Sequence, residues 1–494
     1  MRSQGMNKKM HKSRSINQTS KKPRRRKRGF GRFIFLIVLI VLVVVGGVTA
    51  LKHFSGESYD DEKSFEKYAK KYFSDAQEKD KIGEAVEKFN YGAPVSTAAK
   101  YPTFELKDVD GQIKNKIEML NADYQGKYAE EDTTLKFAQL TTYDSYKSDK
   151  NTGSVVLKTV QREENSKGKQ IQQNAVVNTF NFSLEKGIEI YPVMAFESGY
   201  QKKLSSFFDK YLNENYEGEL TDGYKKYISA DNKFEKFVLN GDGAIFYFDA
   251  GTVVKGSEII SIEVKAKDIE GVFREKINPR NLDPSKPMVA LTYDDGPAPG
   301  TSDRILDVFE RNNCVATFFE QGINVENVKD SDRILKRMDE LDCEIGSHSY
   351  DHPNLFTISD QKVKEQNDKT DKLIEDRIGR KPTVYRPPFG NGNEKTTKIF
   401  NKPGILWSVD TMDWSSRNAD AVINVVKSVK DLDGKVVLMH SLYDSSAKAT
   451  EVLVPWLQKQ GYQLVTVSEL LTYKYHEDPT EAKFYGYNYF YLDK

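Results

Sequence analysis

Between residues 95 and 282, short runs of alternating apolar and polar residues are separated by turn residues. The runs SVVLKTVQRE and QNAVVNTFNF flank NSKGK and predict a β-hairpin, and NKFEKFVLNGDGAIFYF predicts a second hairpin that turns at NGDG. Ile260–Ala266 alternates with a period of two, whereas GYQKKLSSFFDKYLNENY has the apolar spacing of an amphipathic helix. We therefore expect residues 95–282 to form an α+β domain, in which no group of side chains indicates catalysis.

The pattern changes after a Pro- and Asn-rich stretch at residues 278–287, which we expect to be a linker. Strand-like apolar runs such as MVALTYDDG, VATFFEQG and KVVLMHS then alternate with helical patterns such as SDRILDVFERNN. This order is typical of parallel strands joined by crossover helices. Residues 283–475 are therefore expected to form an α/β domain.

Two further segments flank these domains. Residues 52–94 are highly charged, and their apolar residues recur at helical spacing, which predicts either a helical stalk or a solvated linker. The residues at this spacing include Phe65, Tyr68, Ala69 and Phe73. The tail, residues 476–494, ends in KFYGYNYFYLDK and predicts an added strand or a clamp on the domain surface, with stacking on sugars as the alternative.

Charge and hydropathy give the N-terminus a different character. Residues 1–32 carry thirteen Lys and Arg and no acid, and residues 33–51 follow as nineteen residues without a charge. Nineteen residues at ~1.5 Å each just span a bilayer core, and the preceding positive charge places residues 1–32 in the cytoplasm as a basic tail. We expect an uncleaved transmembrane anchor with the rest of the chain outside; a cleaved signal peptide ending at VTA is the alternative. Positive charge beside a membrane span does not indicate nucleic-acid binding.

The chain has two cysteines, Cys314 and Cys343. A location outside the membrane permits a disulfide bond between them, and two buried thiols are the alternative. Two isolated cysteines do not indicate a Cys-rich zinc site.

Chemistry-bearing residues gather in five clusters of the α/β domain, each at or near the end of a predicted strand. The clusters are TYDDG (292–296), HSYDH (348–352), RPPFG (386–390), DTMDW (410–414) and VVLMH (436–440). Strand ends are where parallel α/β sheets and barrels build their sites. We therefore expect the clusters to meet.

The residue types indicate metal-assisted hydrolysis. His348 and His352, with one carboxylate, form a ligand set for a catalytic divalent ion that leaves positions open for water. One of the adjacent Asp294 and Asp295 can bind the ion, whose charge offsets their repulsion, and the other can act as a base toward water of lowered pKa. His440 supplies a candidate general acid.

These five clusters, in this order, resemble those of the NodB-type polysaccharide deacetylases, which are family-4 carbohydrate esterases. The resemblance covers residues 286–475 and implies a distorted parallel (β/α) barrel, often of seven strands. It implies that Asp295, His348 and His352 bind the metal, Zn²⁺ or another divalent transition ion such as Co²⁺, Ni²⁺ or Mn²⁺.

The resemblance also implies roles for the other cluster residues. Asp294 would be the general base, oriented by Arg386, and His440 would protonate the leaving amine with Asp413 setting its protonation. The backbone N–H of Phe389 would hold the oxyanion. The substrate site would be completed by Trp414, Leu438, Pro387 and Gly390, of which Trp414 and Leu438 wall the acetyl pocket.

Members of this family act on peptidoglycan, chitin, poly-N-acetylglucosamine and acetylated xylan. A membrane-tethered enzyme that faces outward meets the cell wall first, so we expect a peptidoglycan N-acetylglucosamine deacetylase with the wall glycan as its partner. The alternatives are a deacetylase of exported poly-N-acetylglucosamine or of N-acetylmuramic acid, and a non-catalytic wall-binding protein on the same scaffold. The sequence leaves open whether residues 95–282 are a spacer or a binding module.

Overall fold

The computed structural model describes residues 59–75, 82–129, 135–165 and 170–490. The expected basic tail and transmembrane anchor, residues 1–32 and 33–51, lie outside these ranges. Within them, every helix is too short or too polar to cross a bilayer.

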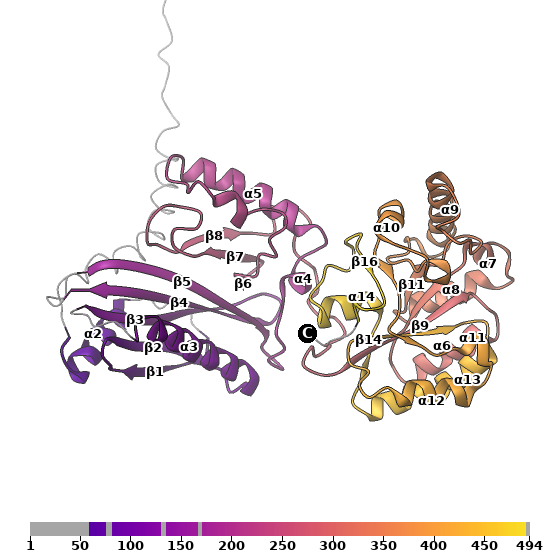
Figure 1. Ribbon diagram of the computed structural model, residues 1–494, viewed down its shortest axis with the longest axis horizontal. Helices are drawn as coiled ribbons and strands as arrows, with labels where there is room; N and C mark the ends of the chain where they lie inside the picture. The colour runs from indigo at the N-terminus through magenta and orange to yellow at the C-terminus, as the bar shows by residue number, and fades with distance from the viewer. Residues whose placement is uncertain (1–58, 76–81, 130–134, 166–169, 491–494) are drawn as a thin grey trace, which may run out of the picture. The chain divides into compact units, whose positions relative to one another are not determined.

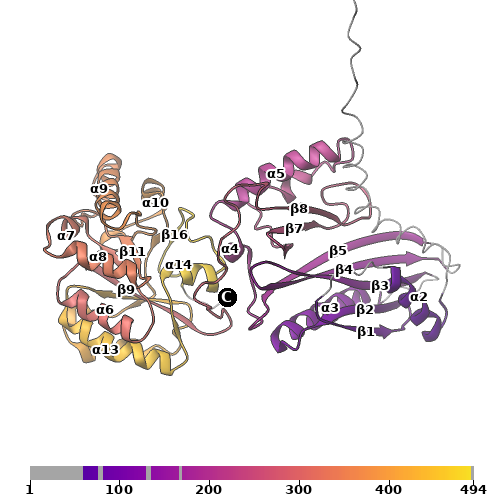
Figure 2. The same cartoon turned by 180° about the vertical axis from the view of Figure 1, so that it is seen from behind.

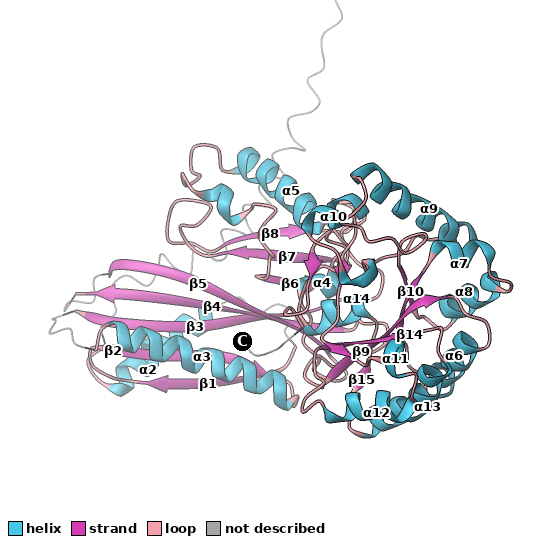
Figure 3. Cartoon of the chain, turned by 45° about the vertical axis from the view of Figure 1, so that its right-hand side comes forward, coloured by secondary structure: helices cyan, strands magenta, loops and turns pink. Residues whose placement is uncertain are grey.

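The first sheet of the α+β region has five strands in sequential order. They are β1 (Glu84–Asn90), β2 (Val95–Thr103), β3 (Lys136–Lys147), β4 (Thr152–Glu164) and β5 (Gln170–Ser183). Only the β2–β3 pair is parallel, and α3 (Lys107–Lys127) connects these two strands and lies along the sheet (Figures 1 and 3). Ile113 and Ile117 of α3 are buried in one hydrophobic cluster with Val155 and Leu157 of β4. The first predicted hairpin is confirmed as the antiparallel pair β4–β5.

The segment expected as a stalk or linker belongs to this sheet instead. Its helical spacing does form a helix, α2 (Glu62–Asp75), but Phe65, Tyr68 and Phe73 are at most 2% exposed. The edge strand β1 pairs with β2 along its whole length. The boundary expected at residue 94 is therefore wrong, because the aromatic face of α2 is buried by packing rather than left in solvent.

A smaller antiparallel sheet follows, with strand order β6-β7-β8. Its strands are β6 (Phe237–Asn240), β7 (Gly243–Phe248) and β8 (Ile260–Val264). The strands β6 and β7 confirm the second predicted hairpin. The predicted amphipathic helix forms as α5 (Tyr200–Asn215), which buries Leu204, Phe208 and Leu212.

The C-terminal region is built on parallel strands, which confirms the α/β prediction. The main ladder has the order β11-β10-β9-β14-β13, and bridges from Ser347 to Tyr385 and from Tyr385 to Gly404 continue it toward β12. The strands are β9 (Met288–Gly296), β10 (Thr317–Glu320), β11 (Glu344–Ser347), β12 (Gly404–Ile405), β13 (Val409–Asp410), β14 (Lys435–His440), β15 (Gln463–Leu464) and β16 (Phe484–Tyr485).

Helices cover the outer side of this ladder (Figure 2). In the order α12, α13, α6, α8 and α9, each helix contacts the next. The helices of the region are α6 (Thr301–Arg311), α7 (Gly322–Asn327), α8 (Ser331–Glu340), α9 (Asp360–Ile378), α10 (Glu394–Phe400), α11 (Asp413–Ser416), α12 (Ala419–Ser428), α13 (Asp444–Lys459) and α14 (Val467–Glu469).

Strand alternation sorts side chains between the two faces of the ladder. On β9, Leu291 and Tyr293 are buried in the cluster that contains the helix residues, and on β14 so is Met439. Successive strand residues point to opposite faces, so Asp294 and His440 share the inner face. Burying each large apolar side chain on the helix-covered face contributes ~1.5–3 kcal/mol, which fixes the register of the strands that carry the site.

Two expected connecting segments are part of the packed structure. Within the linker stretch, Leu282 is buried in a cluster that also holds residues of α5 and β9, and Arg280 Nη1 bonds Glu469 Oε2 at 2.6 Å. The predicted added strand in the tail is confirmed as β16, which pairs in parallel with β12 and buries Tyr485 together with Phe490.

Cys314 and Cys343 are free thiols in the structure, so the disulfide alternative is wrong and the buried-thiol alternative holds. Burial raises the pKa of each thiol to about 12. Thiols of such high pKa carry almost no thiolate at neutral pH and act here as small apolar side chains.

Candidate active site

The buried ion pair between Arg386 and Asp294 lies at the centre of the site. Asp294, near the end of β9, is 3% exposed, and Arg386 is fully buried. Arg386 Nη1 donates to Asp294 Oδ1 at 2.8 Å and to the Thr292 hydroxyl at 2.7 Å. Its Nε and Nη2 donate to the backbone carbonyls of Ile405 and Leu406. Because the guanidinium is held from several sides, it fixes the orientation of the Asp294 carboxylate.

Asp295 and two histidines converge beside this ion pair. Asp295 Oδ1 lies 3.6 Å from His348 Nε2 and 3.7 Å from His352 Nε2. The ligand atoms of these three residues lie within 4.8 Å of one another, so a single ion can reach all three. Asp294 Oδ2 is 3.6 Å from His348 Nε2, so Asp294 borders the same space while its other oxygen bonds Arg386.

The protonation of these groups suits a divalent cation. His348 Nδ1 lies 2.7 Å from the backbone oxygen of Arg386 and donates to it, which leaves the Nε2 lone pair facing Asp295. Burial and the ring of His348 lower the pKa of His352. Burial alone would raise the pKa of Asp295, but the imidazoles of His348, His440 and His352 lower it overall. One carboxylate and two imidazole nitrogens therefore form a ligand set that fits zinc or a related ion.

His440 lies directly across the β9–β14 ladder from Asp294. Its Nδ1 is 2.8 Å from Asp413 Oδ1, and its backbone N–H and the Ser446 hydroxyl both donate to Asp413 Oδ2. Burial alone would lower the pKa of His440, but the hydrogen bond to Asp413 and the charge of Asp294 raise it overall. His440 Nε2, 4.0 Å from Asp295 Oδ2, is thus the ring nitrogen that can exchange a proton with a reacting group.

The RPPFG cluster forms a tight turn next to the histidines. Pro387 and Pro388 are buried, whereas Phe389 is 63% exposed and its ring lies 4.6 Å from that of His352. Phe389 has φ 59° and Gly390 has φ 71°. Among the described residues no acceptor is assigned to the Phe389 N–H, so this donor is available to a ligand.

Other site residues also adopt left-handed backbone conformations. Asp295 has φ 70° and His352 has φ 60°. Residues other than glycine rarely adopt a positive φ, because the Cβ atom is crowded by the backbone. Backbone strain of this kind is found mainly at functional sites, where the surrounding structure enforces it. Here it turns two of the candidate ligands toward the same point.

Most of the strongly exposed apolar side chains of the α/β region belong to the clusters or lie near them in the sequence. Among the described residues of the α/β region and the tail, seven large hydrophobic side chains are strongly exposed. Five of them belong to one of the five clusters or lie within four residues of one in the sequence, and a sixth, Tyr487, lies against Gly390 of the RPPFG cluster. These six are Phe356, Phe389, Met412, Trp414, Leu442 and Tyr487, and we call this set the apolar rim. Exposed apolar side chains next to a group of catalytic residue types are candidates for contact with a ligand. Trp414 therefore lies where a ligand can contact it, whereas Leu438 is buried on the inner face beside Asp410 and Thr292.

Sequence reasoning missed the residues that support Asp295 from the adjacent strand. Gln321, which follows β10, donates to Asp295 Oδ1 at 2.5 Å, and Asn324 donates to the Asp295 carbonyl at 2.9 Å. Both residues lie at or just after the end of a predicted strand, as the five clusters do. Their position in the sequence could therefore have indicated that they belong to the site. Tyr487 was also missed as a site residue; a Cβ on Gly390 would overlap its hydroxyl, so the RPPFG turn requires glycine there.

Glu320, at the end of β10, is a further acidic residue close to Asp294 and Asp295. It is fully buried, and neither carboxylate oxygen has a hydrogen-bond partner among the described residues. Burial and the charges of Asp295 and Asp294 raise its pKa well above the usual range, which favours the uncharged form of the side chain. The uncharged form avoids a third adjacent negative charge in the site.

Comparison with known proteins identifies the family. Residues 281–406, which hold the first three clusters, match the family model described as polysaccharide deacetylase. A peptidoglycan-N-acetylglucosamine deacetylase of Bacillus cereus is 34% identical over 198 residues, which are 38% of this chain and 90% of that protein. The chain belongs to the polysaccharide deacetylase family. The named relatives are deacetylases, which are hydrolases, and the chain is an enzyme of this class.

Two other relatives differ in the sugar that their names specify. The peptidoglycan-N-acetylmuramic acid deacetylase PdaC of Bacillus subtilis is 29% identical over 412 residues, which are 77% of this chain and 86% of PdaC. The peptidoglycan-N-acetylglucosamine deacetylase PgdA of Listeria monocytogenes is 37% identical over 216 residues, 42% of this chain and only 46% of PgdA. A solved PdaC structure is 37% identical, covers 40% of this chain and 95% of that one, and has a TM-score of 0.38.

The arrangement predicts which carboxylate binds metal. We expect the purified wild-type chain to retain a divalent ion, with zinc as the first candidate; Asp295→Ala should lose this ion, because it removes one of three ligands, whereas Asp294→Asn should keep it. Inductively coupled plasma mass spectrometry on both variants measures this. Full zinc occupancy in Asp295→Ala would reject the assignment, and so would loss of zinc from Asp294→Asn alone.

Proposed function

We propose that this enzyme hydrolyses the N-acetyl group of N-acetylglucosamine residues in peptidoglycan, releasing acetate and leaving a free amine. The observation that carries the proposal is the meeting of a ligand triad, an Arg-held carboxylate and an Asp-supported histidine at one sheet edge. The names of the B. cereus and L. monocytogenes relatives support the substrate. N-acetylmuramic acid is the second candidate, since PdaC is similar over 77% of this chain.

A bound divalent ion, Zn²⁺ in our proposal, would polarise the acetyl carbonyl and lower the pKa of water in the site. Asp294 Oδ2, which faces the triad, takes the proton of the attacking water while Arg386 holds Oδ1. The Phe389 N–H donates to the oxyanion that develops on the acetyl oxygen. His440 Nε2 gives a proton to the leaving amine, and Asp413 stabilises the charged imidazole through Nδ1.

Residues Trp414 and Leu438 are proposed to contact the acetyl group, and the apolar rim to contact the sugar rings. Pro387 and Gly390 contribute by shaping the turn that presents Phe389. The alternative of a non-catalytic protein on this scaffold requires a missing ligand or acid, and no such residue is replaced in the five clusters.

We further propose that residues 33–51 anchor the chain in the cytoplasmic membrane, with residues 1–32 inside and the enzyme outside. The uncharged segment and the basic tail before it support this orientation. Such an anchor keeps the enzyme next to the wall glycan.

The proposed reaction can be tested by mass spectrometry of defined muropeptides. After incubation with the zinc-loaded chain, fragment ions should show that the N-acetylglucosamine residue has exchanged its acetyl group for hydrogen. Loss from N-acetylmuramic acid instead would select the second candidate. No acetate release from either sugar would contradict the proposal.

The Asp413–His440 pair predicts a pH effect. Because the pKa of His440 is raised, the ring stays protonated to higher pH than an ordinary imidazole, and activity should fall as pH rises through that pKa. Asp413→Asn weakens a charge-assisted hydrogen bond of ~1.5–3 kcal/mol, so this alkaline limb should move about 1–2 pH units lower. The readout is the pH profile of kcat, with the melting temperature as folding control. An unmoved limb in a folded variant would remove His440 as the acid.

The position of Tyr487 predicts that its side chain contributes to substrate binding. Tyr487→Ala removes an aromatic side chain that is 45% exposed beside Gly390, and KM for N-acetylglucosamine oligomers should rise about 3–10-fold with a smaller change in kcat. Val452→Ala, which truncates the exposed side chain outside the apolar rim, is the matched control. Equal KM values for Tyr487→Ala and the wild type would exclude a sugar contact at Tyr487.

A further inference from the structure

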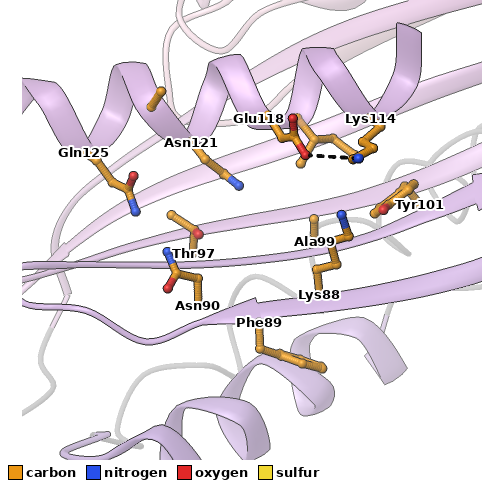
Figure 4. A pocket seen from close by; sticks show the side chains of 12 residues that line it. Lys88, Phe89, Asn90, Thr97, Ala99, Tyr101, Lys114, Glu118, Asn121 and Gln125 are labelled. Atoms are coloured by element: carbon orange, nitrogen blue, oxygen red, sulfur yellow. Dashed lines mark ion pairs between the residues drawn. The ribbon is translucent and has the colours of Figure 1, made fainter. Parts of the chain in front are cut away.

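A groove with a mixed polar and apolar lining lies in the α+β region, between helix α3 and the strands β1 and β2 (Figure 4). It has a volume of about 240 Å³ and no connection in sequence to the five catalytic clusters. Its lining includes Lys88, Asn90, Thr97, Asn121 and Gln125. Nothing in the proposed reaction uses these residues.

Strand register and helix spacing bring the lining together. Asn90 of β1 pairs with Thr97 of β2, so both side chains stand on the face that α3 covers. On α3, Asn121 and Gln125 are four residues apart, and their side chains point from the helix toward the strands, into the groove (Figure 4). The groove is thus an opening between the polar flank of a packed helix and the edge strand.

A chain of amide hydrogen bonds orients Asn121. Gln161 Nε2 donates to Gln139 Oε1 at 2.9 Å, and Gln139 Nε2 donates to Asn121 Oδ1 at 2.6 Å. Gln139 is fully buried, so this arrangement is part of the domain interior. Because the oxygen of Asn121 is occupied, its Nδ2 group is left to donate into the groove.

Two further amides have unused hydrogen-bonding capacity. No side-chain hydrogen bond is assigned to Asn90 or Gln125 among the described residues, and Figure 4 shows both pointing into the opening. The lining carries one net positive charge, because Lys114 lies 3.8 Å from Glu118 whereas Lys88, over the Tyr101 ring, keeps its charge. Neutral amides beside apolar and aromatic side chains such as Tyr101 and Ile117 suit the hydroxyl groups, the acetamido groups and the ring faces of a sugar polymer.

We propose that this groove binds the N-acetylated glycan of the cell wall, with the three amides pairing with sugar hydroxyl and acetamido groups. The choice of glycan rests on the proposed function, which places the chain at the wall. A second contact on the same polymer raises the effective concentration of glycan at the active site. The α+β region is thereby a glycan-binding module rather than a spacer.

The test is sedimentation of the full chain, in detergent, with purified peptidoglycan sacculi stripped of anionic polymers. Chelator is present so that the wall is not altered. Asn90→Ala with Gln125→Ala should weaken binding about tenfold, since several hydrogen bonds are lost. Gln172→Ala with Asn174→Ala, which truncates two exposed amides on β5, should bind as the wild type does. Gln125→Glu, which replaces donors by oxygens at constant shape, should also weaken binding.

Separate outcomes distinguish this inference from the proposed function. Acetate release by the wild-type chain from soluble muropeptides tests the reaction alone. If acetate is released but the groove variants bind sacculi as tightly as the wild type, the groove inference is overturned and the reaction stands. Binding that disappears when anionic polymers are stripped also overturns it. Groove-dependent binding without acetate release supports the groove and contradicts the reaction.

Discussion

The site depends on how two adjacent carboxylates are given different partners. Asp294 is bound by the buried Arg386, whereas Asp295 is turned by a left-handed backbone toward His348 and His352. A buried ion pair is costly unless its remaining groups are hydrogen-bonded. Here the Thr292 hydroxyl and two carbonyls supply those bonds, so the pair can hold Asp294 in place for proton transfer.

The parallel ladder gives this division of roles its geometry. On one side of β9, His440 of β14 lies opposite Asp294. On the other side, Gln321, which follows β10, donates a hydrogen bond to Asp295. Each position is fixed by apolar side chains on the opposite strand face, so packing against the helices positions the chemistry. Glu320 is consistent with this arrangement, because its burial next to Asp294 and Asp295 raises its pKa.

Local sequence patterns predicted what depends on near neighbours. Strand alternation and the five clusters gave the two hairpins, the α/β region and the residues that meet at Asp295. They could not give Tyr487, which reaches Gly390 only because β16 pairs with β12, nor the packing of α2 on the first sheet. Those features arise from pairings between distant segments, which periodicity does not encode. Likewise, the raised pKa of Glu320 follows from burial that the run TFFEQG does not reveal.

A crystal structure of the zinc-loaded chain, with anomalous scattering measured at the zinc edge, tests the central claim most directly. The account predicts one ion bound by a carboxylate oxygen of Asp295 and by Nε2 of His348 and of His352, with Asp294 still bonded to Arg386. An ion bound directly by Asp294, or an ion found only away from these three side chains, would contradict it.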